Sequence, residues 1–288
     1  MSRLRRKMDE NEEGVATTVG TIMALLIFLS ILSLITQQYV PVWMEDNEAY
    51  HMEEVKGQFA DIKGGVDSLV INDMTDYPRY SSVNLGTEGI PMFAGSSPGR
   101  LNFSPNWNET ENKGMSIEFI DTEDDELVSY TSSGNISYHA VNREFEDQSL
   151  IYEHGAIILQ QSDGEIMRAR PQISVEYLGE DGDGQDNYDI SMTKFHLTGT
   201  SESIGGTSRV GVTTELIGTF SNSYSGVEDL DWDLTTAYPR VWSDYINNET
   251  AAEAETNGTV VEISLPGDDY NINELEFRRV RVQVDVER

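Results

Sequence analysis

The chain of 288 residues contains no cysteine. Disulfide bonds are therefore excluded, and so are thiolate metal sites and cysteine nucleophiles. A domain without disulfides depends on a buried apolar core for its stability. The polar part of the chain is long enough for one large β domain or for two smaller ones.

Basic side chains are also scarce, because 19 Lys and Arg stand against 51 Asp and Glu and the formal net charge is −32. Such a surface repels nucleic acid and anionic lipid, so we expect no nucleic-acid partner. Only 5 of the 19 basic residues are lysines. High acidity with little lysine favours a halophile over an acidic mesophile. Multimolar salt shortens the Debye length to about 3 Å or less, so it screens the repulsion among the acidic side chains.

Signals for catalysis are weak throughout the chain. Four histidines are scattered without metal-ligand spacing: His51, His139, His154 and His196. Residues 95–99 match the pattern G-x-S-x-G, but the residue after the serine is Pro98, which has no N–H to offer an oxyanion hole. We interpret this segment as a loop and expect a protein that is not an enzyme.

One acidic turn is the only candidate for a cation site. Asp181, Asp183 and Asp186 lie in a glycine-rich stretch, and oxygen ligands at such spacing suit Ca²⁺. The stretch fails the EF-hand pattern, which requires glycine at the sixth position and glutamate at the twelfth. A solvated acidic turn is therefore favoured over a Ca²⁺ site, and no cofactor is expected.

An unbroken apolar run extends from about Val19 to Val40, and no charge interrupts it. Its 22 residues would extend roughly 33 Å as a helix, which is enough to cross a bilayer. The apolar core of a cleaved signal peptide usually has only about 7–15 residues, so a retained membrane anchor is favoured. Tyr39 and Trp43 would lie in the outer headgroup layer.

The charges on the two sides of this run differ in sign. Basic residues precede it (Arg3, Arg5, Arg6 and Lys7), and acidic residues follow it (Glu45, Asp46, Glu48, Glu53 and Glu54). The positive-inside tendency then places the N-terminus in the cytoplasm and the large C-terminal part outside the cell.

The segment Glu12–Leu26, EEGVATTVGTIMALL, resembles the N-terminus of archaeal type IV pilin-like proteins. These have a short charged leader, a Gly or Ala at the processing point and an apolar helix directly after it. The resemblance implies cleavage by a prepilin-type peptidase between Gly14 and Val15. It also implies a helix that anchors the chain and forms the core of a filament, and a β-rich globular domain. The family usually has Lys or Arg where this chain has Glu13.

Small residues and glycosylation sequons are consistent with this interpretation. Gly20 and Ala24 lie four residues apart on one helix face, where small side chains let helices approach closely in lipid. Five N-x-S/T sequons follow in the predicted outer part, at Asn102, Asn108, Asn135, Asn248 and Asn257. We expect at least one of them to be used.

A second, amphipathic helix is predicted after the apolar run, with Pro41 kinking or ending the first one. Six apolar residues recur at spacings of three and four: Met52, Val55, Phe59, Ile62, Val66 and Leu69. This stripe either packs against the chain's own β domain, which is favoured, or forms a coiled-coil contact in a stalk. The expected parts are a leader (1–14), a transmembrane helix (15–43), an amphipathic stalk (44–74) and a β-rich domain (75–288).

The remaining chain alternates short apolar–polar runs with turn signals, which is typical of an antiparallel β-sandwich or jelly roll. Near the C-terminus, Leu275 and Phe277 share one parity, whereas Val280 and Val282 share the other. This shift predicts a β-bulge at Arg278 and Arg279, or two strands that meet there. A short helix is expected around residues 241–255, and the domain is one sandwich or two.

Taken together, the chain is predicted to be a membrane-anchored, pilin-like structural or interaction subunit of the haloarchaeal cell surface. Its expected partners are the membrane, copies of itself or other pilin-like subunits, and a prepilin-type peptidase. An alternative is an unprocessed, signal-anchored surface protein whose β domain binds glycan or Ca²⁺. A tethered hydrolase is less favoured, since fold alone cannot exclude it.

Overall fold

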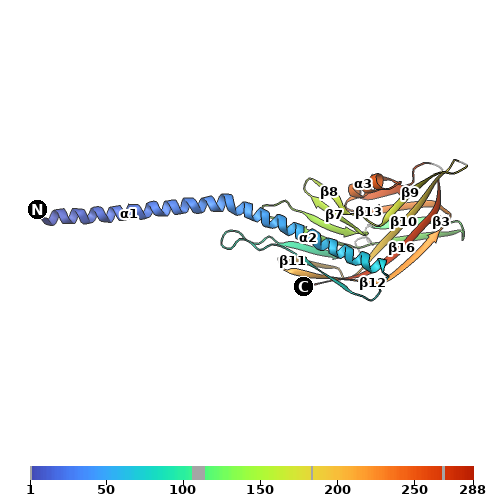
Figure 1. Cartoon of the computed structure of the whole chain (residues 1–288), viewed down its shortest axis with the longest axis horizontal. Coiled ribbons are helices and arrows are strands. Elements are labelled where there is room, and N and C mark those ends of the chain that lie inside the picture. Colours follow the sequence, from blue (N-terminus) through green and yellow to red (C-terminus); the bar gives the residue numbers. More distant parts are fainter. Residues whose placement is uncertain (1, 106–113, 183, 268–269) are drawn as a thin grey trace.

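The computed structural model describes residues 2–105, 114–182, 184–267 and 270–288. It consists of one long N-terminal helix and a β domain, and the first half of the helix projects away from the domain (Figure 1). The predicted class, mainly β with a long apolar N-terminal helix, is confirmed. The antiparallel sheets pack in a sandwich-like arrangement.

The helix continues through Pro41. Its three consecutive parts are α1 (Ser2–Leu34), one π-helical turn η1 (Ile35–Tyr39) and α2 (Val40–Ile71). Pro41 lies in the first turn of α2, and the N–H of Val40 donates to the carbonyl of Ile35. Proline lacks an N–H and its ring crowds the carbonyl four residues earlier, so the wider π turn gives it room. The helix axis bends at this junction, which makes Pro41 a kink and not an end (Figure 1).

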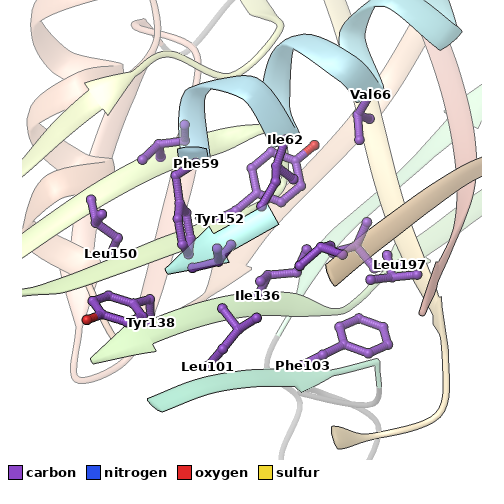
Figure 2. Packing of buried hydrophobic residues seen from close by; sticks show 14 of the residues in the cluster. Phe59, Ile62, Val66, Leu101, Phe103, Ile136, Tyr138, Leu150, Tyr152 and Leu197 are labelled. Carbon is purple, nitrogen blue, oxygen red and sulfur yellow. The ribbon is translucent and has the colours of Figure 1, made fainter. Parts of the chain in front are cut away.

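The apolar stripe of α2 is buried in the β domain. Each of its six residues is at most 1% exposed: Met52, Val55, Phe59, Ile62, Val66 and Leu69. Figure 2 shows Phe59 and Ile62 directed at side chains from the strands, among them Ile136 and Tyr152. Packing against the chain's own domain is confirmed. The alternative prediction, a stalk that presents this stripe to another helix, is wrong, because side chains of the chain's own core already cover the stripe.

Two sheets build the domain. The ten-stranded sheet contains β1 (Arg79–Asn84), β12 (Arg209–Tyr224), β16 (Tyr270–Glu287), β13 (Val227–Thr235), β15 (Val260–Ser264), β14 (Glu253–Asn257), β10 (Asp186–Gly199), β9 (Ile173–Glu180), β3 (Met115–Asp121) and β4 (Glu126–Ser132). The six-stranded sheet contains β11 (Glu202–Gly206), β2 (Gly99–Ser104), β5 (Asn135–Ala140), β6 (Ser149–Glu153), β7 (Ala156–Gln161) and β8 (Gly164–Ala169). Among the described strand pairs, β10 with β16 is parallel and the others are antiparallel.

The predicted bulge in the C-terminal strand is wrong. β16 runs unbroken through Arg278 and Arg279, and its register with β10 and β12 does not shift there. Phe277 packs into one core cluster, whereas Val280 packs into another. Because side chains alternate between the two faces of a strand, the change of parity means that the two clusters lie on opposite faces of the sheet.

The first cluster joins α2 to both sheets, and the second joins the far part of the large sheet to helix α3 (Pro239–Glu249). Strand β10 passes through both clusters, as β16 does, since Met192 belongs to the second and Phe195 to the first. These two strands therefore connect the two clusters within the described β region. The predicted short helix is present but ends at Glu249, and β14 begins at Glu253.

Candidate functional site

The apolar half of the helix is uncovered on every side. Its most apolar window has a mean hydropathy of 2.5, and none of that window is buried inside the structure. The large side chains around its circumference are exposed: Val19, Ile22, Met23, Leu25, Leu26, Ile27, Phe28, Leu29, Ile31 and Leu34. Among the described residues, one helix is both long enough and apolar enough to cross a membrane, and it is this one. Such a surface requires lipid or other apolar helices around it.

The predicted processing residues lie inside this helix. Gly14 and Val15 are both within α1, far from the β domain along the helix (Figure 1). Gly20 and Ala24 are exposed, and a Cβ added to Gly20 would meet nothing within 4 Å. Any partner of this face therefore lies outside the single chain.

The domain covers the helix up to the last residue of the apolar run. Val40 is 5% exposed and Met44 is 1% exposed, although Tyr39, Val42 and Trp43 remain about half exposed on the other side of the helix. The rings of Tyr39 and Trp43 lie 6.1 Å apart. No solvated spacer separates the predicted membrane span from the folded domain.

Glu48 fastens the helix to the domain at this end. Its carboxylate is fully buried and accepts hydrogen bonds from the N–H groups of Arg143 (2.9 Å), Glu144 (2.9 Å) and Phe145 (2.7 Å). It also accepts one from the hydroxyl of Ser97. Burial by itself raises the pKa of Glu48, but the four hydrogen bonds together lower it by more than burial raises it. The net pKa therefore lies below the ordinary 4.5. We call Glu48 and these four donors the carboxylate clamp.

Sequence reasoning placed Glu48 among the acidic residues after the span and missed the clamp. One signal was available, because Glu48 continues the spacing of Val40, Met44 and Met52 and so points to the buried face. The segment proposed as a loop, residues 95–99, is indeed a loop up to Pro98, and Ser97 serves the clamp.

A protruding loop follows β1 at the same end. Residues 87 and 97 pair across its base, and its outer turn is closed by the N–H of Phe93, which donates to the carbonyl of Ile90 at 3.0 Å. Met92 in this turn is 99% exposed and Phe93 is 40% exposed. We call Ile90–Phe93 the tip. In Figure 1 this teal segment reaches back along the helix to the level of the bend.

Two of the three residues of the Ca²⁺ candidate, Asp181 and Asp186, lie within the described residues. Asp181 Oδ1 accepts the N–H of Gln185 at 2.9 Å, and Asp186 Oδ1 accepts the hydroxyl of Tyr177 at 2.9 Å. Asp183 lies outside the described residues. In the part of the chain that the structure describes, no group of three or more His, Asp or Glu side chains is placed to hold a metal ion.

The sequons differ in accessibility. Asn248 and Asn257 are exposed, and Asn102 is half-buried with its side chain bonded to Ser203. Asn135 is only 4% exposed, so the folded domain has no room for a glycan there and this candidate is withdrawn. Asn108 lies outside the described residues.

The histidines include two buried ones, His51 and His154. His51 Nε2 lies 3.0 Å from the carbonyl of Asn84.

His154 lies near Lys194, a buried lysine whose ammonium donates to the carbonyl of Tyr130. Burial, with a smaller contribution from the nearby Arg279, lowers the pKa of Lys194 from 10.5 to about 7.

A polar groove of about 610 Å³ lies on the large sheet. Its lining is rich in hydroxyl groups, from Ser174, Ser191, Thr193, Ser221 and Ser223, and carries the charged groups of Glu276 and Arg278. The guanidinium of Arg278 donates to Ser221 at 3.3 Å.

Residues 110–286 match DUF7289, a family of unknown function, and the chain belongs to this family. The match spans β3 to β16 and leaves out the helix, β1 and β2. No curated protein and no solved structure matches the chain.

Proposed function

We propose that this DUF7289 chain is a membrane-anchored, pilin-like structural subunit of a haloarchaeal cell surface, able to assemble through its N-terminal helix. The observation that carries the proposal is a single helix with two opposite environments. Its apolar run is bare, whereas one face of its second half is buried in the first core cluster of the domain. The bare part of the helix therefore contacts partners outside the chain, and α2 holds the domain in a fixed position relative to those partners.

The stiffness of this connection supports a structural role. No loop separates α1 from α2, and the carboxylate clamp ties the helix to two separate loops of the domain. A subunit of a filament needs such a connection, because the helix packing then determines where every domain lies. An enzyme on a tether has no comparable need.

The topology follows from charge. The basic residues before the apolar run would remain in the cytoplasm, and the acidic domain would lie outside. The exposed sequons Asn248 and Asn257 are then available for glycosylation.

Processing is tested first, by mass spectrometry of the N-terminal peptide of the full chain. The chain is produced in archaeal cells with a prepilin-type peptidase and recovered from their membranes. A mature start at Val15 supports the proposal, and the variant Glu13→Lys, which restores the residue type usual in the family, should be processed at least as completely. A leader that stays intact in both chains favours the unprocessed surface anchor instead.

Assembly is tested with a matched pair of glycines. A Cβ at Gly20 and a Cβ at Gly64 would both meet nothing within 4 Å in the single chain. Gly20→Leu should reduce filament yield about tenfold or more, because a small residue allows close helix contact. Gly64→Leu, on α2, should leave the yield unchanged. Equal yields for both variants would show that helices do not pack through Gly20.

Glycan binding is a second candidate, favoured by the hydroxyl-rich groove with Glu276 and Arg278. Calorimetric titration of the full chain with the sugars of the cell's own surface tests it at native salt. Loss of a measured heat in Glu276→Gln would support this candidate, and the absence of any heat in the unmodified chain would oppose it.

A further inference from the structure

We propose that the tip, Ile90–Phe93, inserts into the lipid bilayer beside the helix as a second membrane contact of the domain. The proposal rests on the membrane anchoring proposed above and adds a partner, lipid, for a loop with no other assigned role. Four observations carry it: the level of the tip along the helix, its composition, its backbone conformation and its surroundings.

The domain end that carries the tip lies at the membrane surface. Val40, the last residue of the apolar run, is only 5% exposed because the domain already covers it. When residues 19–40 lie in the bilayer, the nearest parts of the domain must therefore touch the headgroup layer. No water layer then separates this end of the domain from the headgroups, so a segment that protrudes from it must enter the bilayer.

The tip extends from that end toward the membrane. Ser97, at the base of the loop, is bonded to Glu48 and so lies at its level on the helix. The tip is roughly three extended residues beyond this base, or about 10 Å. That distance equals about seven residues of α-helix, which brings the tip to the level of Pro41. Figure 1 agrees, because the segment reaches the level of the bend.

The side chains of the tip suit the boundary between headgroups and hydrocarbon. Met92 is 99% exposed and Phe93 is 40% exposed, and the four residues Ile90, Pro91, Met92 and Phe93 carry no charge. A single exposed apolar side chain is ordinary on a protein surface, but here two of them, Met92 and Phe93, are adjacent in an uncharged turn. At a similar level on the helix, Tyr39 and Trp43 are also half exposed, and such rings favour the interface.

The backbone of the tip holds Met92 outward. Pro91 and Met92 are the central residues of a turn that the Phe93 N–H closes onto Ile90. Met92 has a φ of 71°, in the left-handed region that usually requires glycine or asparagine in such a turn. A bulky apolar side chain at a strained and fully exposed position points to a requirement outside the fold itself.

The insertion is apolar and does not depend on anionic lipid, which the acidic domain repels. Together with the helix, the tip would give the domain two points of attachment. The domain could then neither rotate about the helix axis nor tilt freely above the bilayer, so each subunit would present the same face outward.

Spin-label depth measurements test the proposal, and the absence of native cysteine makes each label unique. The full chain is reconstituted in phosphatidylcholine nanodiscs at multimolar salt, with a nitroxide on Met92→Cys. Tyr39→Cys serves as the membrane reference. Asp125→Cys is the distal control: it shares the left-handed conformation, with φ of 52°, and lies between β4 and β3, whose label stands at the end of the domain away from α1 in Figure 1.

Insertion predicts that lipid-soluble oxygen relaxes the labels on Met92→Cys and Tyr39→Cys more than a water-soluble nickel chelate does. The Asp125→Cys label should show the reverse. Adding Phe93→Asp to the Met92→Cys chain should return that label to water, because a charge at the tip opposes insertion.

Three results overturn the assignment in different ways. A Met92→Cys label in water beside a Tyr39→Cys label in lipid would reject insertion and leave anchoring intact. Both labels in water would reject the anchoring itself. Protection of the Met92→Cys label in lipid-free filaments, with no access from lipid in nanodiscs, would make a neighbouring subunit the partner.

Discussion

Replacing Glu48 by glutamine tests the carboxylate clamp with a change of few atoms. The carboxylate offers two acceptor oxygens to four donors, three of which are backbone N–H groups. An amide keeps one oxygen and turns an NH₂ group toward the remaining donors. At least one backbone N–H would then face another donor, since the hydroxyl of Ser97 can turn and accept from the amide.

The expected loss can be estimated from these contacts. A donor left without an acceptor costs about 1–3 kcal/mol, so the free energy of unfolding should fall by about 1–3 kcal/mol. Two-state denaturant unfolding of the full chain in detergent measures this change. Hydrogen exchange should also quicken at the amides of Arg143, Glu144 and Phe145, because the clamp no longer holds them.

The same group predicts a pH dependence with a definite sign. Folding lowers the pKa of Glu48 below 4.5, so the unfolded chain binds its proton more tightly. The stabilisation is therefore present above about pH 4.5 and is lost as the pH falls through the folded pKa. Glu48→Gln should lack this part of the acid sensitivity.

Glu45→Gln is the matched control, because Glu45 lies one turn earlier on the helix and is exposed. Its unfolding should match that of the unmodified chain within about 0.5 kcal/mol. A change of less than about 1 kcal/mol in Glu48→Gln, with unaltered exchange at residues 143–145, would refute the clamp as the attachment of the helix.

Three further outcomes are expected. Lys194→Met should stabilise the domain at pH 7 by about 2–4 kcal/mol, because burial of this lysine favours its neutral form. Since its folded pKa of about 7 lies below the ordinary 10.5, the unmodified chain should gain about 1.4 kcal/mol per pH unit between these values, and the variant should lack that gain in denaturant titrations at several pH values. Phe59→Ala should lower the free energy of unfolding by about 3–5 kcal/mol, since the ring is fully buried between α2 and the sheets, and thermal unfolding measures this. Asn135→Gln should leave the glycan mass of the native protein unchanged because Asn135 is buried, whereas loss of mass in intact-protein spectra would contradict this burial.

Local patterns were sufficient for the elements whose environment repeats along the chain. The apolar run has the length of a membrane-crossing helix, and the stripe from Met52 to Leu69 has the period of a helix with one buried face, so both helices were predicted. Pro41 was read as a kink or an end, and the π turn before it decided for the kink.

Tertiary structure decided what depends on partners distant in sequence. The parity shift between Phe277 and Val280 was visible, but it is explained by two cores on opposite faces of one sheet, which no local pattern shows. Glu48 looked like one acid among many, because its donors lie 49 to 97 residues away. The level of the tip, likewise, depends on how a loop after β1 packs beside α2.

The sequence by itself thus determined the long apolar helix, the β class and the acidic, cysteine-free composition, because hydropathy, periodicity and charge are properties of neighbouring residues. Only the tertiary structure decided that one face of α2 is buried in the β domain, that a buried carboxylate clamps the helix there, and that an apolar tip lies at the level where the apolar run ends. These features depend on contacts between segments that are far apart in the chain and become buried together. No single segment of the sequence reveals such a contact.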